Sequence, residues 1–221
     1  MKTENLTHVY FLPGMSASSA IFERIKLPTE KYKMHFLEWL MPLSKDESLS
    51  DYAKRFAKQI TAANPILIGV SFGGILAQEI AQIIPCKKII IISSIKSPTE
   101  YSFFFKTVKT TRLYKLYPVT FLNFLEQFLY KKGSSKIKNT LTVYRKFLPI
   151  RNKLYTQWAI RSFLLWKGSH NNLPLLHIHG NSDQIIPIKY IKNCEVIKNG
   201  THAMILTKSS SIEQYILRYL A

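Results

Sequence analysis

Gly69-Val70-Ser71-Phe72-Gly73 is the stretch of sequence that decides the fold. It follows a short apolar run at residues 65–68, which predicts a buried strand, and it precedes residues 74–84, whose apolar spacing predicts a helix. A serine between two glycines at a sharp strand-to-helix turn is typical of a nucleophile elbow. The glycines remove the Cβ atoms that would collide where the helix folds back on the strand. Chance alone would give such a pattern in about one chain in forty of this composition, so the flanking strand and helix matter.

The length and composition indicate a globular chain with one sizeable core. Its 221 residues are 47% hydrophobic, and no segment reaches 18 uninterrupted apolar residues, so we expect no transmembrane helix. The first residues lack the apolar stretch of a signal peptide. Cys86 and Cys194 stand in no metal-binding spacing, which favours free thiols in a reducing compartment. We therefore expect a cytoplasmic protein, and a monomer as the simplest state.

Strand-like and helix-like segments alternate along the chain, which predicts an α/β fold with a mostly parallel sheet of about six strands. The isoleucine-rich run at residues 87–94 suits a strand that is buried on both faces. We expect the strands at residues 9–12, 34–40, 65–68, 87–94, 173–180 and 194–197, and the helices at residues 19–25, 49–62, 74–84 and 208–219.

Residues 96–170 break this alternation and carry most of the charge. They hold 15 of the 31 Lys and Arg residues against only Glu100 and Glu126, in a chain whose net charge is +18. The segment is rich in aromatic residues and reads as several amphipathic helices. We therefore predict a helical lid at residues 96–170, inserted into a core formed by residues 1–95 and 171–221.

A serine nucleophile needs a general base, and His202 is the best-placed candidate. It lies in Asn199-Gly200-Thr201-His202-Ala203-Met204, between the last expected strand and the last expected helix. Loops at the carboxyl ends of strands are where α/β sheets keep their sites. His177 and His179 alternate along an expected strand, and we interpret them as structural.

The base needs an acid to orient it, and the chain has only three aspartates. Asp46 and Asp51 flank an expected helix start, where capping explains them. Asp183 follows an expected strand, although an Asx-turn would also account for it there. The order Ser71, Asp183, His202 is the order expected for such a triad.

The motifs G-V-S-F-G, H-G-N-S-D-Q-I-I-P and G-T-H-A-M together resemble the α/β-hydrolase superfamily over nearly the whole chain outside the lid. The resemblance implies a three-layer fold with Ser71 as nucleophile, His202 as general base and Asp183 as its partner. It implies no metal and no organic cofactor. Because little sequence precedes the first expected strand, we expect the first two strands of that superfamily to be missing, which leaves about six rather than eight.

The superfamily usually has H-G-x after an early strand, where this chain has Leu12-Pro13-Gly14-Met15. The oxyanion donors are backbone groups, so the missing histidine does not remove the chemistry. We expect the N–H groups of Met15 and Phe72 to form the oxyanion hole, and Gly14 and Phe72 to contact substrate.

These features predict a serine hydrolase that cleaves a carboxylic ester or thioester through an acyl-enzyme. The basic lid suggests an acyl group carried on an acidic partner, either an acyl carrier protein or coenzyme A, and carboxylesterases acting on carrier-bound methyl esters resemble this plan. A solvated positive face and contact with an anionic membrane are alternative uses of the same charges. We expect no nucleic-acid partner. The alternative function is a non-hydrolytic use of the fold, either a lyase, a cofactor-free oxidative enzyme or a binding protein with an idle triad.

Overall fold

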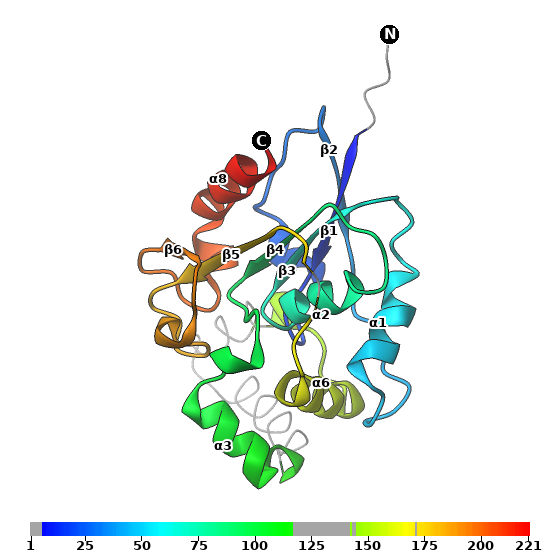
Figure 1. Cartoon of the computed structure of the whole chain (residues 1–221), viewed down its shortest axis with the longest axis vertical. Coiled ribbons are helices and arrows are strands. Elements are labelled where there is room, and N and C mark those ends of the chain that lie inside the picture. The colour runs from blue at the N-terminus through cyan, green and yellow to red at the C-terminus, as the bar shows by residue number, and fades with distance from the viewer. Residues whose placement is uncertain (1–5, 117–141, 143–144, 171) are drawn as a thin grey trace.

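A computed structural model describes residues 6–116, 142, 145–170 and 172–221. Six strands form one sheet in the order β2-β1-β3-β4-β5-β6, and every neighbouring pair is parallel (Figure 1). This confirms the predicted α/β class and the expected strand number. The strands are β1 (Thr7–Leu12), β2 (Tyr32–Phe36), β3 (Ile66–Val70), β4 (Lys88–Ile92), β5 (Leu175–Gly180) and β6 (Glu195–Ile197).

Helices cover both faces of this sheet, and short 3-10 turns join several of them (Figure 1). The α-helices are α1 (Leu49–Ala57), α2 (Phe72–Ile80), α3 (Phe103–Thr111), α6 (Lys153–Leu165), α7 (Met204–Thr207) and α8 (Ser209–Leu220). The 3-10 turns are η1 (Ser19–Phe22), η2 (Pro98–Glu100), η3 (Leu113–Leu116) and η4 (Ile188–Tyr190).

The strand side chains divide into two hydrophobic clusters, one on each face. In β4, Ile89 and Ile91 pack with α1, α2 and α6, whereas Ile90 and Ile92 pack with η1, α7 and α8. Successive side chains of a strand point to opposite faces, so a strand covered on both sides must be apolar throughout. The continuous isoleucine run therefore forms the middle of a three-layer structure.

Several elements are shorter than the sequence predicts. β2 ends at Phe36 rather than at residue 40, because the chain turns away from the sheet after Leu37 donates its N–H to the Phe11 carbonyl. α1 ends at Ala57 rather than at residue 62, because residues 58–60 donate their N–H groups to carbonyls three positions earlier, as in a 3-10 helix. α2 likewise ends at Ile80.

The predicted helix at residues 19–25 was wrong in type, since only the short turn η1 forms there. The predicted role of Asp46 and Asp51 as caps is also corrected. Ser48 is the N-cap of α1, because its Oγ accepts a hydrogen bond from the Asp51 N–H at 3.0 Å. The Asp51 carboxylate in turn accepts a hydrogen bond from the Ser48 hydroxyl. Asp46 lies 3.4 Å from Arg161.

Within the predicted lid segment, α3 and α6 lie at the end of the molecule opposite the N-terminus (Figure 1). α6 packs its buried face, which includes Tyr155, Trp158 and Phe163, into the same cluster as α1 and α2. α3 buries none of its side chains. The rest of that segment, residues 117–141 and 143–144, lies outside the described residues, so the domain boundaries stay a prediction.

Candidate active site

Ser71 lies between β3 and α2 in a strained backbone conformation. Its φ of 52° and ψ of −119° fall where residues other than glycine are rarely found. The turn is held from β4, because the Ser71 N–H donates to the Ile92 carbonyl at 2.9 Å and the Ser94 hydroxyl donates to the Ser71 carbonyl at 2.7 Å. The strain is consistent with a side chain that the fold presents for function rather than for packing.

The glycines on either side of the elbow are required by close packing. A Cβ on Gly69 would lie 2.3 Å from the Gly73 carbonyl oxygen, and a Cβ on Gly73 would lie 2.3 Å from the Pro13 carbonyl oxygen. Any side chain at either position would therefore displace backbone. The G-x-S-x-G pattern is explained here by geometry.

The structure brings Ser71, Asp183 and His202 together from three separate loops. The His202 Nε2 lies 3.0 Å from the Ser71 Oγ, and the His202 Nδ1 lies 2.8 Å from the Asp183 Oδ2. The side chain of Asp183 is fully buried, whereas the imidazole of His202 is 26% exposed. This is an unbroken chain of hydrogen bonds from a buried carboxylate to a hydroxyl in a strained turn.

Asp183 is held as an anion despite its burial. Burial alone would raise the pKa of this carboxyl, but the hydrogen bond and charge of His202 and the N–H of Ile186 outweigh burial and lower it. The Asp183 Oδ1 accepts from the N–H groups of Ile185 and Ile186 at 2.9 and 2.8 Å. The turn that would explain Asp183 structurally is therefore present, and it fixes the other oxygen toward His202.

The loop after β1 lies against the elbow. An added Cβ on Gly14 would be 3.6 Å from the Ser71 Cβ, so only the space of a methyl group separates this loop from the serine. Among the described residues, neither the Met15 N–H nor the Phe72 N–H has a hydrogen-bond partner. Two unpartnered backbone donors therefore flank Ser71, one from the loop and one from the first residue of α2.

Trp39 also lies at this site, and sequence reasoning missed it. Its indole Nε1–H donates to the Gly14 carbonyl at 2.9 Å, and its ring stacks on Phe72 with centroids 5.3 Å apart. Trp39 follows β2, and the contact joins residues 25 positions apart, so no local pattern signals it. The sequence predicts a strand that runs to residue 40 and so includes Trp39. In the structure β2 ends at Phe36, and Trp39 lies outside the sheet.

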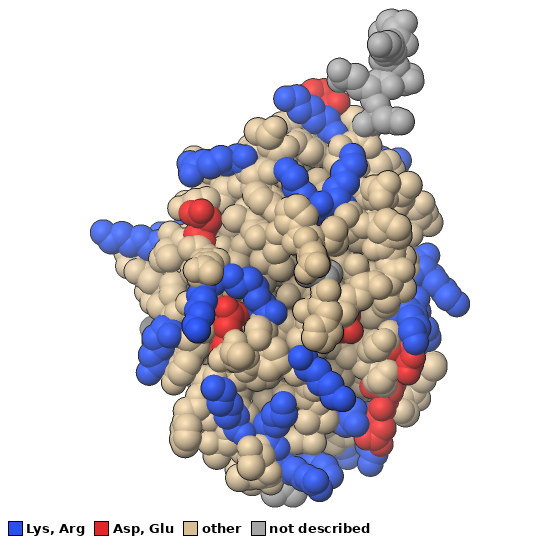
Figure 2. Space-filling model, in the orientation of Figure 1, with Lys and Arg blue, Asp and Glu red and all other residues tan. Residues whose placement is uncertain are grey.

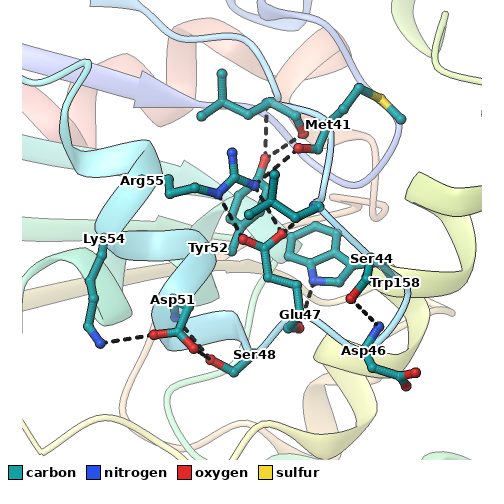
Figure 3. Close-up of polar contacts among 12 residues, drawn as sticks. Met41, Ser44, Asp46, Glu47, Ser48, Asp51, Tyr52, Lys54, Arg55 and Trp158 are labelled. Carbon is teal, nitrogen blue, oxygen red and sulfur yellow. Dashed lines mark hydrogen bonds and ion pairs between the residues drawn. The ribbon is translucent and has the colours of Figure 1, made fainter.

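The segment that follows Trp39 is clamped to α1 and α6 (Figure 3). The Tyr52 hydroxyl donates to the Leu40 carbonyl at 2.9 Å and accepts the Leu40 N–H at 3.0 Å. Arg55 binds both carboxylate oxygens of Glu47, at 2.8 and 2.9 Å, and the Trp158 indole donates to the Glu47 carbonyl (Figure 3). These contacts attach Leu40 and Glu47, at the two ends of this segment, to α1 and α6.

His177 and His179 are buried behind Asp183, as interpreted from the sequence. The His179 Nε2 donates to the Ile186 carbonyl at 2.8 Å and lies 3.5 Å from the Asp183 Oδ2. Burial lowers the pKa of both imidazoles, and that of His177 falls to about 3. Both rings are therefore neutral and pack as part of the core.

Basic side chains gather over α3, with few acidic neighbours (Figure 2). Lys106, Arg112 and Lys115 are exposed there, next to the exposed rings of Phe103 and Phe104. Other basic residues of the predicted lid have partners, such as Lys146, which lies 2.8 Å from Glu23. α3, its C-cap Arg112 and the following turn η3 therefore present one of the exposed positive surfaces of the described residues.

The described part of the chain lacks a metal-binding cluster and a membrane-spanning helix. No group of three or more His, Cys, Asp or Glu side chains there is placed to hold a metal ion. None of the described helices combines the length and the apolar character needed to cross a bilayer.

Comparison with known proteins places these features in context. No family model matches the chain. The pimeloyl-[acyl-carrier protein] methyl ester esterase of Wigglesworthia glossinidia brevipalpis is 26% identical over 220 residues, which cover 87% of this chain and 81% of that protein. A hydrolase from Oleispira antarctica has a TM-score of 0.70 at 14% identity, over 97% of this chain and 91% of that one. A bromoperoxidase from Bacillus anthracis has a TM-score of 0.65 at 18% identity, over 98% and 92%.

Proposed function

We propose that this chain, which has the α/β-hydrolase fold, is a serine hydrolase that cleaves carboxylic esters or thioesters. The observation that carries the proposal is the hydrogen-bonded chain from Asp183 through His202 to Ser71. Proteins of this architecture include a hydrolase and a bromoperoxidase, so the fold leaves the reaction open and the site must decide it.

The hydrogen bonds select a tautomer of His202 that suits a general base. With the proton on Nδ1 facing the buried Asp183 carboxylate, Nε2 is free to accept the Ser71 hydroxyl proton. As Ser71 Oγ attacks the acyl carbon, His202 takes that proton and becomes an imidazolium. Asp183, held as an anion, stabilises the positive charge so formed.

The rest of the cycle follows from proton balance. The tetrahedral intermediate collapses, the bond to the alcohol or thiol breaks, and His202 Nε2–H protonates the leaving group. Water then enters, gives a proton to His202 and attacks the acyl-enzyme. The second intermediate releases the carboxylic acid, and Ser71 recovers its proton from His202.

The Met15 and Phe72 N–H groups form the oxyanion hole in this proposal. Both are unpartnered among the described residues, and the loop that carries Met15 lies against the elbow, since a Cβ on Gly73 would be 2.3 Å from the Pro13 carbonyl oxygen. A preorganised donor at such a position contributes about 10²–10³ in rate in other hydrolases. Gly14 and Phe72 would contact the acyl group, because they lie at the two N–H groups that bind its carbonyl oxygen.

The acyl group is carried on an acidic partner in this account, either an acyl carrier protein or coenzyme A. The exposed cations of α3 support this substrate class through charge complementarity. The relative from Wigglesworthia glossinidia brevipalpis is named for a carrier-bound methyl ester, which favours the same class.

A turnover screen tests the proposed reaction. Wild-type protein and Ser71→Ala should be assayed on p-nitrophenyl esters of increasing chain length and on acyl-coenzyme A thioesters. We expect turnover by the wild type and a loss of at least about 10³-fold in Ser71→Ala. Equal turnover by the two proteins would show that Ser71 is not the nucleophile, and no turnover by either would favour the non-hydrolytic alternative.

A further inference from the structure

Trp39 contacts Phe72 and the Gly14–Met15 peptide, which carry the two N–H groups assigned to the oxyanion hole. Its indole N–H donates to the carbonyl of Gly14 at 2.9 Å, and its ring lies parallel to that of Phe72, at an interplanar angle of 13°. The two hydrogen-bond donors of the hole come from Met15 and Phe72. One side chain therefore bridges the loop after β1 and the start of α2.

The bond to Gly14 fixes the direction of the Met15 N–H. The Gly14 carbonyl and the Met15 N–H belong to the same peptide unit, and all peptide bonds of the described residues are trans. In a planar trans peptide the C=O and the N–H point in opposite directions. Holding the oxygen on the side of the indole therefore directs the N–H to the other side. The Ala17 N–H also donates to the Gly14 oxygen, at 3.0 Å, and completes the restraint.

Trp39 is itself held by a shell of aromatic rings and by a backbone clamp. The Tyr52 hydroxyl bonds both the N–H and the carbonyl of Leu40, the next residue. An indole fixed in this way can resist rotation of the Gly14–Met15 peptide, whereas a mobile one could not. The rings within 6.5 Å of the Trp39 ring, centroid to centroid, are those of Tyr52, Phe56, Phe72, Tyr155 and Trp158.

From this geometry we infer that Trp39 is a positioning residue of the oxyanion hole, acting through the Gly14–Met15 peptide and through Phe72. The inference rests on the proposed function, because an oxyanion hole matters only if Ser71 attacks a carbonyl. The indole N–H is occupied by Gly14 and does not reach the substrate. Its effect therefore belongs to the transition state, where the oxyanion forms, and not to ground-state binding.

The test replaces the indole N–H and keeps an aromatic ring. Trp39→Phe is compared with Trp166→Phe, which deletes another indole N–H, one that bonds the Glu79 carboxylate at 2.7 Å and does not belong to the rings around Trp39. A third protein carries 3-benzothienylalanine at position 39, which keeps the bicyclic shape and lacks only the donor. We would measure kcat and KM on one p-nitrophenyl ester, together with inhibition by an alkyl boronic acid, whose adduct with Ser71 is a tetrahedral anion.

We expect both changes at position 39 to lower kcat about tenfold, with KM changed less than about twofold, since a loosened donor loses part of the 10²–10³ that a deleted one loses. Boronate affinity should fall by the same factor, and Trp166→Phe should keep the wild-type kcat. If the position 39 variants match Trp166→Phe, or raise KM at unchanged kcat, the positioning role is wrong although the hydrolase stands. If the wild type neither turns over esters nor binds boronate, the proposed function fails as well. Should Trp39→Phe not fold, the benzothienylalanine protein decides.

Discussion

Gly180 and Gly200 lie so close that a Cβ on Gly180 would be 2.2 Å from the Gly200 carbonyl oxygen. Gly180 ends β5 and precedes the loop of Asp183, and Gly200 lies two residues before His202. The Ser182 N–H donates to the Gly200 carbonyl at 2.9 Å across this contact. The two loops are therefore packed backbone to backbone, and this packing sets the distance between the acid and the base.

Gly180→Ala should separate these loops. The added methyl group can be accommodated only if backbone moves, so we expect a loss of about 1–3 kcal/mol in the free energy of unfolding and a large loss of kcat. Urea denaturation and ester turnover measure the two effects. Gly14→Ala is the control for the unfolding measurement alone, because its Cβ would meet only ordinary contacts at 3.6 Å or more. Unchanged turnover in Gly180→Ala would contradict the account of this contact.

Asp183→Asn should lower kcat by about 10⁴ and leave the fold intact. The asparagine oxygen can still accept from Ile185 and Ile186, but its NH₂ group cannot accept the His202 Nδ1–H. Steady-state kinetics and thermal unfolding measure the two properties. Asp46→Asn serves as the control, since that side chain is 64% exposed and only faces Arg161. A similar kcat in both variants would mean that Asp183 has only a structural role.

The buried His177 should make the protein less stable as the pH falls below about 6.5. Burial first, and the neighbouring charge of His179 next, lower the pKa of His177 to about 3, whereas the unfolded chain takes up this proton near 6.5. Below pH 6.5 the unfolded state therefore binds more protons than the folded state, so the free energy of unfolding decreases as the pH decreases. The loss due to this residue is about 2 kcal/mol between pH 6.5 and 5.

Urea denaturation of wild type and His177→Gln at pH 7.5 and 5.0 measures this contribution. The variant should lose less stability than the wild type between the two pH values. The exposed His170→Gln should follow the wild type. Parallel pH dependence in the wild type and His177→Gln would show that His177 does not stay neutral in the folded protein.

Charge reversal on α3 tests the anionic carrier. Lys106→Glu with Arg112→Glu should lower kcat/KM on an acyl carrier protein substrate about tenfold at low salt, because these exposed cations would attract the carrier. The matched free ester should react at the wild-type rate. Lys33→Glu, on exposed β2, is the control. No preference of the wild type for the carrier substrate, together with binding to anionic vesicles, would assign the charges to a membrane surface instead.

The sheet could be predicted because its strands carry their own signal. The β-branched run of β4 is buried on both faces, and the six expected strands all form. The meeting of Ser71, Asp183 and His202 could also be anticipated, since parallel strands bring their carboxyl ends to one edge. Helix lengths were overestimated because apolar spacing continues past the point where the backbone of α1 and α2 tightens.

Trp39 could not be predicted, because its role depends on a bond to a carbonyl 25 residues away. The sequence shows only an aromatic residue after a strand, which core packing would explain equally well. The Gly180–Gly200 contact could not be predicted either. From the sequence each glycine only predicts a turn, and the contact is seen only when the two loops are placed side by side. Contacts of this kind are set by tertiary packing and leave no local periodicity.

Covalent labelling by a fluorophosphonate, followed by mass spectrometry of the modified peptide, tests the central claim most directly. The claim is that Asp183 and His202 activate Ser71 as a nucleophile. The account predicts a single phosphonylated residue, Ser71, with labelling abolished in Ser71→Ala and slowed in His202→Ala. Wild-type protein that is folded and never labels, or that labels at another residue, would contradict it.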